Sequence, residues 1–423
     1  MAKQFENNME ECFSTSKGVF YLKSLSLEDN GSVSQVIKKR IEAINDENQE
    51  SEEGDAFFVA DIGVIKRQHK KWKTVLPRIE PFYAVKSNPE PLVLKTLANL
   101  GTGFDCASKD EIQRILDLSV DPSRIVFAQT TKQISFLRHA QKHKVKLMTF
   151  DNEDELYKIK HKYPGAELLL RIQTDKIKGS VNFGMKFGAS LDSTKPLLQL
   201  AKALGLNIIG VSYHAGCLIA EPRAYRDALE HARSVFDEAK ELGYDMNLVD
   251  VGGGFPATME AGITFEVIAS RLSQAVDDMF PKDVRVIAEP GRFYSTNAFT
   301  LCTQIISRRV VSTEGDSDPT FMYYINDGIF GSFRTLDFGY IHPVLKVLRK
   351  NQEIQDDWSG EKVYTSSIWG PTCSPDDFVA KETKLPKLES GDWIIWEKMG
   401  SYTSPASSEF NGIPKPKVYF TET

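Results

Sequence analysis

Short apolar runs alternate with segments of helical periodicity from about residue 56 to residue 291. The runs have the length of buried strands: FFVAD (57–61), FYAVK (82–86), GTGFD (101–105), RIVFA (124–128), KLMTFD (146–151), ELLLRI (167–172), NIIGVSYH (207–214), MNLVDVGGG (246–254) and RVIAEPG (285–291). Between most of them, apolar residues recur three or four positions apart, as in KDEIQRILDL and AYRDALEHARSVFDEAKEL. Buried strands that alternate with helices predict a parallel sheet, and about eight such units fit a closed (β/α)₈ barrel. An open doubly wound sheet is the alternative, although no GxGxxG follows the first strand.

The pattern changes after residue 296. Strand-like runs dominate there, namely FTLCTQIISRRVVS, FMYYIND, KVYTSSIWG, GDWIIWEKMG and KVYF. They predict a β domain over residues 296–423, after a barrel over residues 55–295. Residues 1–54 carry a short apolar run at 19–22 and a helical pattern at 33–44, and this N-terminal segment is expected to contribute to the β domain.

Composition excludes several classes of protein. The chain has 423 residues, of which 41% are hydrophobic and 26% charged, as in an ordinary soluble globular protein. A net charge of -6 offers no general attraction to nucleic acid or to an anionic membrane. No apolar run approaches the roughly 18 residues of a membrane span. The five cysteines are widely spaced without CxxC, so we expect reduced thiols, a cytoplasmic location and no metal site.

Polar residues and glycines stand at the C-terminal ends of the apolar runs. They are Lys86, Asp105, Asp151, Arg171, His214, Gly252, Gly253, Gly254 and Glu289. In a barrel those strand ends form the face on which active sites are built. Each residue alone is more often a loop or capping residue, but several in phase indicate an active site.

Lys86 closes the run FYAVK. A lysine at the mouth of a packed strand is partly desolvated, so its amine can lose its proton and attack a carbonyl. A lone lysine in such a place is more often a surface residue, and its meaning depends on the groups around it.

Two turns supply complementary groups. The triplet Gly252 to Gly254 lets backbone N–H groups approach an anion, although a tight turn would have the same sequence. The segment AEPGR places Glu289 and Arg292 in one turn, where the guanidinium suits a phosphate and a local ion pair is the alternative. A Schiff-base lysine, a phosphate cradle and a carboxylate for a pyridinium nitrogen are what pyridoxal phosphate requires. The residues therefore indicate a pyridoxal-phosphate enzyme, with a phosphate-binding barrel aldolase as the alternative.

A family resemblance extends this interpretation. PFYAVKSN, GTGFDCAS, LLLRI, MKFGA, GVSYHAG, DVGGGFP, AEPGRFY, FMYYINDG, GSF, SSIWGPTC, GDWIIWEKMGSYT and FNG are similar to segments of the eukaryotic ornithine decarboxylase family, over nearly the whole chain. The resemblance implies a barrel, a C-terminal β domain and a head-to-tail homodimer with two shared active sites. It also implies decarboxylation of an amino acid with pyridoxal phosphate as cofactor.

The resemblance implies a role for individual residues. Lys86 corresponds to the lysine that binds the cofactor, Asp105 and Arg171 to cofactor-site residues, His214 to the imidazole stacked on the ring, and Glu289 to the partner of the pyridine nitrogen. The phosphate-binding set corresponds to Gly252, Gly253, Gly254, Gly291, Arg292 and Tyr402, with Cys217 where the family has a serine. Cys373 corresponds to a cysteine that enters from the opposite subunit and helps protonate the product carbon.

The departures from the family lie at the substrate end. Ser374 replaces an aspartate that binds the distal ammonium of ornithine, Phe338-Gly339 stands where Tyr-Asp is expected, and Phe330 replaces a tyrosine. With Cys373 and Phe410, these are the expected substrate-binding residues. A buried ammonium without carboxylates costs several kcal/mol, whereas a buried aliphatic side chain gains roughly 1.5–3 kcal/mol. We therefore expect a neutral, apolar amino acid, with leucine first and methionine, isoleucine, valine and phenylalanine after it.

Other interpretations stay open. Asp337, Asp376 or Asp377 would restore an acid if the loop register differs, and the enzyme would then act on ornithine or another basic amino acid. The family also includes antizyme inhibitors, inactive relatives that bind antizyme, and the basic segment at 131–151 corresponds to the family's antizyme-binding region. Because those proteins lose cofactor-site residues and this chain retains them, the sequence favours an enzyme.

Overall fold

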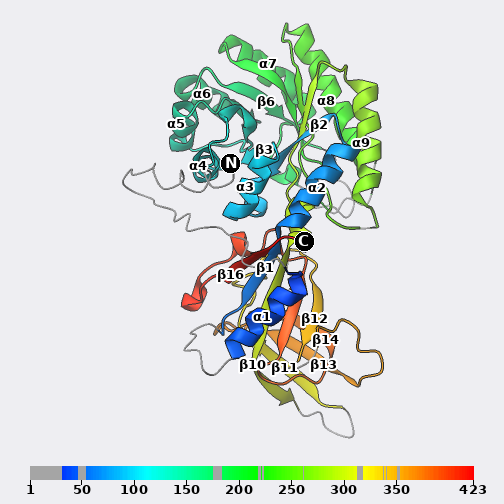
Figure 1. The fold of residues 1–423 in the computed structure, drawn as a ribbon. Coiled ribbons are helices and arrows are strands. Elements are labelled where there is room, and N and C mark those ends of the chain that lie inside the picture. Colours follow the sequence, from blue (N-terminus) through cyan, green and yellow to red (C-terminus); the bar gives the residue numbers. More distant parts are fainter. Residues whose placement is uncertain are drawn as a thin grey trace, which may run out of the picture.

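A computed structural model describes residues 31–45, 54–174, 183–217, 221, 223–260, 262–311, 318–336, 338–339, 341–349 and 353–423. Two lobes are visible in Figure 1, an α/β barrel and a β domain. No helix in this described part of the chain is long and apolar enough to cross a membrane.

Eight parallel strands form a closed barrel, as the apolar rhythm predicts. They are β2 (Ile79–Ala84), β3 (Gly103–Cys106), β4 (Ile125–Phe127), β5 (Leu147–Phe150), β6 (Glu167–Arg171), β7 (Asn207–Ser212), β8 (Leu248–Asp250) and β9 (Arg285–Ala288). Pairing of β2 with β9, in register from Ile79 opposite Val286, closes the ring. The open doubly wound sheet is therefore excluded.

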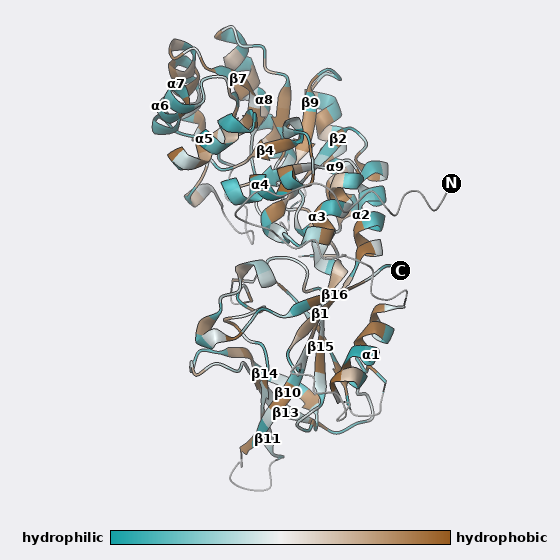
Figure 2. Cartoon of the chain, turned by 60° about the vertical axis from the view of Figure 1, so that its left-hand side comes forward, coloured by the Kyte–Doolittle hydropathy of each residue, from teal (hydrophilic) through white to brown (hydrophobic). Residues whose placement is uncertain are grey.

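Helices follow the barrel strands and cover them. They are α3 (Pro91–Asn99), α4 (Lys109–Asp117), α5 (Ile134–Lys142), α6 (Glu153–Lys162), α7 (Leu191–Ala203), α8 (Ala224–Glu241), α9 (Phe265–Met279) and α10 (Arg292–Ser295). Short 3₁₀ turns are η1 (Val85–Ser87), η2 (Pro122–Arg124), η3 (Phe183–Met185), η4 (Thr296–Ala298), η5 (Ser404–Ala406) and η6 (Phe410–Gly412). In Figure 2 the barrel strands are largely hydrophobic, whereas the helices also carry hydrophilic residues.

The barrel has an inner and an outer apolar layer. Leu169 belongs to a cluster with Phe82, Val126 and Ile287 from other strands, whereas its neighbours Leu168 and Leu170 belong to the main core with the helices. This alternation follows the two-residue period of a strand. The outer layer anchors the helices, and the inner layer fills the barrel below the strand ends.

The β domain is an eight-stranded sheet. Six of its strands follow the order β12-β15-β10-β11-β13-β14, and the other two are β1, which pairs with β10, and β16, which pairs with β1. Its strands are β1 (Phe57–Asp61), β10 (Phe299–Val311), β11 (Thr320–Ile325), β12 (Val344–Leu348), β13 (Val363–Trp369), β14 (Phe378–Pro386), β15 (Trp393–Glu397) and β16 (Lys417–Thr421). Helix α1 (Val33–Asn45) packs Val36, Ile37 and Ile41 into a cluster with Trp393 of this sheet.

The run at 57–61 is not a barrel strand, although the alternation of apolar runs and helical segments predicts it to be one. This run is β1, which pairs antiparallel to β10 and parallel to β16, so the chain enters the barrel only after α2 (Ile62–Val75). A run that is buried on both faces has the same composition in either sheet, which is why its pattern did not separate them. The apolar run at 19–22 lies outside the described residues.

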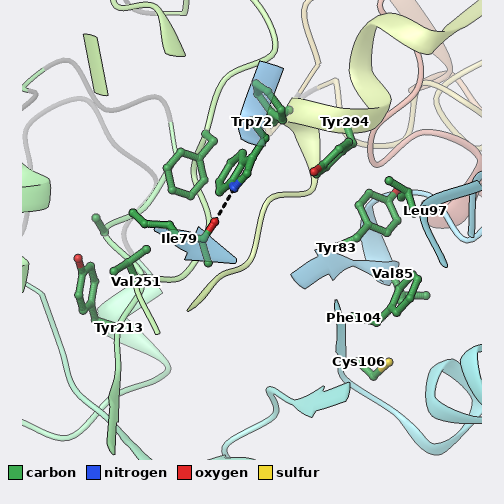
Figure 3. Packing of buried hydrophobic residues seen from close by; sticks show 14 of the residues in the cluster. Trp72, Ile79, Tyr83, Val85, Leu97, Phe104, Cys106, Tyr213, Val251 and Tyr294 are labelled. Carbon is green, nitrogen blue, oxygen red and sulfur yellow. Dashed lines mark hydrogen bonds between the residues drawn. The ribbon is translucent and has the colours of Figure 1, made fainter. Parts of the chain in front are cut away.

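Helix α2 carries a fully buried tryptophan of the barrel core. Trp72 is fully buried, its Nε1 donates to the carbonyl of Ile79 at 2.9 Å, and its ring lies 4.9 Å from that of Phe255 and 5.3 Å from that of Phe293. Figure 3 shows the hydrogen bond at the start of β2. Trp72 therefore joins the start of the barrel to its last turns.

We expect Trp72→Ala to lower the free energy of unfolding by about 3–5 kcal/mol, because it leaves a large cavity. Trp72→Phe should cost about 1–2 kcal/mol, since it keeps the apolar contacts and loses the hydrogen bond to Ile79. Urea unfolding monitored by circular dichroism measures both, with the half-buried Trp358→Phe as a control of small effect. Equal losses for the two Trp72 variants would contradict this account of the packing.

Candidate active site

A cavity of about 350 Å³ opens at the C-terminal ends of the barrel strands. Its wall includes most of the residues predicted for the cofactor: Lys86, Asp105, Arg171, His214, Cys217, Gly253, Gly254, Glu289, Gly291, Arg292 and Tyr402. All but Tyr402 come from the barrel. The volume lies within the usual range for small-molecule sites.

Lys86 projects into this cavity from η1, directly after β2. Its side chain is 42% exposed, and its ammonium pairs with the Oδ2 atom of Asp105, which is fully buried on β3. Burial opposes the charge on the ammonium, but Asp105 and then Glu289 outweigh this effect and raise the pKa of Lys86. The amine is thus held in place by a carboxylate and is charged until a partner takes its proton.

Three buried carboxylates, those of Asp105, Asp250 and Glu289, lie near one another. Within the described residues, Oδ1 of Asp105, Oδ2 of Asp250 and Oε1 of Glu289 are buried and have no hydrogen-bond partner. Burial, and then the neighbouring Asp105 and Asp250, raise the pKa of Glu289 well above its usual value. A cationic N–H donor bound in the cavity would give Glu289 a partner and favour its ionised form.

His214 follows β7 and is neutral. Burial, Arg171 and Lys86 lower its pKa to about 3. Its Nδ1 atom accepts a hydrogen bond from the backbone N–H of Gly216 at 3.0 Å, so the neutral ring carries its proton on Nε2. A Cβ atom at Gly253 would lie 2.9 Å from that Nε2, so glycine is needed beside the imidazole.

The glycine triplet approaches two backbone segments closely. Gly252 and Gly254 have φ of +67° and +95°, and a Cβ atom on either would lie 2.1 Å from a carbonyl oxygen. Arg292 is 8% exposed, and its guanidinium carbon lies 5.2 Å from the centroid of the Tyr402 ring. A guanidinium, a phenol and unobstructed backbone suit an anion such as a phosphate ester.

These residues fit pyridoxal phosphate at each end of the molecule. Lys86 would provide the amine for its carbonyl, Glu289 a buried carboxylate oxygen for its ring nitrogen, and Arg292 with the glycines the anion site. The barrel and this set of residues together define the class of pyridoxal-phosphate-dependent barrel enzymes.

Comparison with known proteins gives the family. Residues 62–296 match the family model "Pyridoxal-dependent decarboxylase, pyridoxal binding domain". The chain is 45% identical over 388 residues to antizyme inhibitor 2 of Xenopus laevis, covering 90% of this chain and 84% of that protein. It is 42% identical over 404 residues to ornithine decarboxylase of Mus musculus, covering 93% and 86%. The solved arginine decarboxylase of Paramecium bursaria Chlorella virus is 33% identical, with a TM-score of 0.83 over 92% of this chain and all of that one. The chain therefore belongs to the pyridoxal-phosphate-dependent decarboxylases of the ornithine decarboxylase family.

The expected substrate-binding residues lie elsewhere in the same chain. Phe330, Phe338, Gly339, Cys373, Ser374 and Phe410 all belong to the β domain, and the described wall of the cavity does not include them. Three of them lie together: the ring centroids of Phe330 and Phe410 are 4.7 Å apart, and the N–H of Cys373 donates to Oδ1 of Asn411 at 3.1 Å. Cys373 is exposed, as is 56% of Phe338. A single copy of the chain thus keeps its cofactor site and its expected substrate end apart.

The acids considered as replacements differ in their surroundings. Asp377 is 1% exposed, and its oxygens accept from the backbone N–H groups of Ile329 and Thr372 at 2.8 and 2.9 Å and from Oγ1 of Thr372 at 2.6 Å. It braces the loop that carries Cys373 and is not available to a substrate. Asp376 is exposed, and Asp337 lies outside the described residues.

Sequence reasoning missed Asp250, Gln129 and Phe187 and misplaced Asp151. Asp250 ends β8 two positions before the glycine triplet, so the strand-end rule would have found it. Gln129 and Phe187 also line the cavity. Each lies in a loop, and only knowledge of which loops face the cavity could have indicated them. Asp151 ends its apolar run but is not in the described cavity wall, because its Oδ2 atom accepts from the N–H of Gly188 at 2.8 Å.

The thiol of Cys217 should make the anion site weaker than a serine would. Burial raises the pKa of Cys217, so the thiol stays protonated and is a poor hydrogen-bond donor. We expect Cys217→Ser to lower the dissociation constant of pyridoxal phosphate about two- to tenfold, as one added hydrogen bond does. Titration of cofactor-free protein by visible absorbance measures it, with Cys302→Ser in the β domain as a matched control. Unchanged or weaker cofactor binding by Cys217→Ser would show that this position does not contact the anion.

Proposed function

We propose that the protein removes CO₂ from a neutral, apolar amino acid, with leucine as the first choice. One observation carries the choice of substrate: the β-domain residues expected at the substrate's far end are Phe330, Phe338, Gly339 and Ser374, without the acids that an ammonium needs. The cofactor residues, in contrast, are retained and gathered in one cavity.

The proposed chemistry divides among the residues of the cavity. When bound, pyridoxal phosphate serves as the sink for the electrons left by the departing carboxylate. Lys86 would hold the cofactor at its carbonyl group until the substrate's amino group takes its place, and Glu289 would keep a proton on the ring nitrogen. His214, kept neutral by its surroundings, would add no charge to this site. Cys373 of a second copy is proposed to deliver the proton that replaces CO₂.

Free energy favours an apolar side chain at the substrate end. Asp377 already accepts three hydrogen bonds from its own domain, and Gly339 has φ of +67°, a conformation that favours glycine over a residue with a carboxylate. An ammonium buried there without a partner would cost several kcal/mol, and each 1.4 kcal/mol is about tenfold in affinity. The paired rings of Phe330 and Phe410 offer an aliphatic chain an apolar surface instead.

We further propose a homodimer with shared active sites. The support is the separation within one chain: the cavity lies in the barrel, whereas Cys373, Phe330 and Phe410 lie together on the β domain. A second copy that brings its β domain to the cavity would complete the site.

The similarity to antizyme inhibitor 2 favours a second candidate function, binding of antizyme without catalysis. Within the corresponding segment, Arg138, Lys142 and Lys144 are exposed, whereas Lys132 is buried. The retained Lys86, Asp105 and Arg292 are the reason to prefer an enzyme. Visible absorbance of lysine-bound cofactor in the purified protein separates the two, because an inhibitor that has lost the cofactor is colourless.

Purified protein loaded with cofactor should release CO₂ from leucine with a kcat/KM at least about a hundredfold above that for ornithine, given the cost of an unpaired ammonium. Ser374→Asp should raise turnover of ornithine and lower that of leucine, with Ser374→Asn as the uncharged control. A panel of amino acids assayed by CO₂ release measures this. Faster turnover of ornithine, lysine or arginine than of leucine would refute the proposed substrate class.

Mixing two inactive variants tests the shared site. Lys86→Ala and Cys373→Ala chains should each have little activity alone. After equimolar exchange of subunits, about a quarter of the sites should carry both residues, because half of the dimers are mixed and each has one intact site. Recovery of about a quarter of wild-type activity supports sharing, and no recovery despite mixed dimers on a tagged-subunit pull-down argues against it.

A further inference from the structure

A buried ion pair lies just behind one wall of the cavity. The side chains of Lys132 and Glu155 are fully buried, with Nζ of Lys132 2.9 Å from Oε1 of Glu155. The same Nζ donates to the carbonyls of Gln129 at 2.9 Å and Thr149 at 2.6 Å, so the ammonium has three acceptors. Lys158, at 2.5 Å from Oε2, supplies a second cation to Glu155.

The pair fixes the loop that follows β4. Glu155 accepts from the backbone N–H of Lys132 at 3.2 and 3.3 Å, and Lys132 holds the carbonyl of Gln129 through its ammonium. Both ends of the segment from Gln129 to Lys132 are therefore tied to β5 and α6. Gln129, which begins this segment, and Ala128 before it line the cavity.

The turn between β5 and α6 also fixes a second loop. Asp151, directly after β5, accepts from the N–H of Gly188 at 2.8 Å, and Asn152 donates to the other oxygen of Asp151 at 2.7 Å. Gly188 has φ of +100°, and a Cβ atom there would lie 2.7 Å from the backbone nitrogen of Gln173. Its neighbour Phe187 lines the cavity and lies 5.8 Å from the guanidinium carbon of Arg171.

We propose that Lys132, Glu155 and Asp151 are positioning residues for the substrate, and that Gln129 and Phe187 are the specificity-determining side chains that they hold. The inference rests on the proposed function, since it assumes that an amino acid occupies this cavity. One turn, Asp151 to Glu155, sets the position of two cavity residues from loops about 58 positions apart in the chain.

Stability alone does not account for the pair. Replacing a buried ion pair with uncharged groups of similar size is often neutral or stabilising, whereas removing one partner leaves an uncompensated charge. What an uncharged replacement cannot do is hold the carbonyls of Gln129 and Thr149 with one ammonium. The two roles are therefore separable in a double variant.

The test compares K132M/E155Q with K146M/E167Q, a matched double variant of an exposed pair 4.0 Å apart. K132M/E155Q should unfold within a few degrees of wild type, yet show a KM raised about tenfold for the best amino-acid substrate and a kcat within about threefold. Asp151→Ala should act in the same direction, and Asp151→Asn, which retains an acceptor for Gly188, should recover most of the loss. The control should match wild type in all respects.

Hydrogen exchange gives a readout independent of turnover. The backbone amides at 128–132 should exchange faster in K132M/E155Q, and those at 186–190 faster in Asp151→Ala, while those at 285–292 stay unchanged. A wild-type KM together with wild-type exchange in these segments would overturn the inference. So would a fall in stability and kcat that accompanies the rise in KM, because that pattern marks a purely structural role. If the wild type decarboxylates no amino acid, the proposed function fails, and the exchange rates still decide whether this turn holds the wall.

Discussion

Buried negative charge at the mouth of the barrel is the constraint on which the rest of this structure depends. Asp105, Asp250 and Glu289 are each 6% exposed or less, and the cations that face them are Lys86 and Arg171. Carboxylates so close together cannot all ionise without compensation, which is why burial and mutual repulsion raise the pKa of Glu289. A ligand that brings a protonated ring nitrogen offsets this cost, so these charges suit pyridoxal phosphate.

Closure of the site depends on contacts between the two domains. The N–H of Tyr402 donates to the carbonyl of Ser87, next to Lys86, at 2.9 Å, and Nδ2 of Asn88 donates to the carbonyl of Gly400 at 2.9 Å. The segment that carries Tyr402 is therefore registered against the end of β2. The barrel carries Lys86 and the buried carboxylates of the cavity, while the β domain places Tyr402 in the cavity wall of its own barrel and keeps Phe330 and Cys373 out of that wall. Such a division lets the substrate end change while the cofactor site stays fixed.

Patterns local in sequence predicted most of the fold and the cofactor site. Each strand of the barrel reads as an apolar run, and Lys86, Asp105, Arg171, His214 and Glu289 are found at the face that the strand-end rule indicates. The rule erred at Asp151, because a strand-end carboxylate turned toward a neighbouring loop has the same sequence signature as one turned into the cavity. It also could not assign β1, whose partners come from residues about 240 and 360 positions away in the chain.

Long-range contacts account for what the sequence did not reveal. The burial of Lys132 depends on packing between the β4 loop and α6, and a lysine among other basic residues looks like part of a solvated face until its partners are known. The role of Asp377 was equally hidden, since only its contacts with Ile329 and Thr372 distinguish a loop brace from a substrate acid.

We infer that a working decarboxylase site faces a substrate pocket without acids. The most direct measurement is a crystal structure of the cofactor-loaded protein with 3-methylbutylamine, the amine that leucine yields. We expect the amine's branched end to contact Phe330 and Phe410 of a second copy, with no carboxylate within hydrogen-bonding distance. A carboxylate such as that of Asp376 or Asp337 converging on that end, or a cavity remote from the second copy's Cys373, would contradict it.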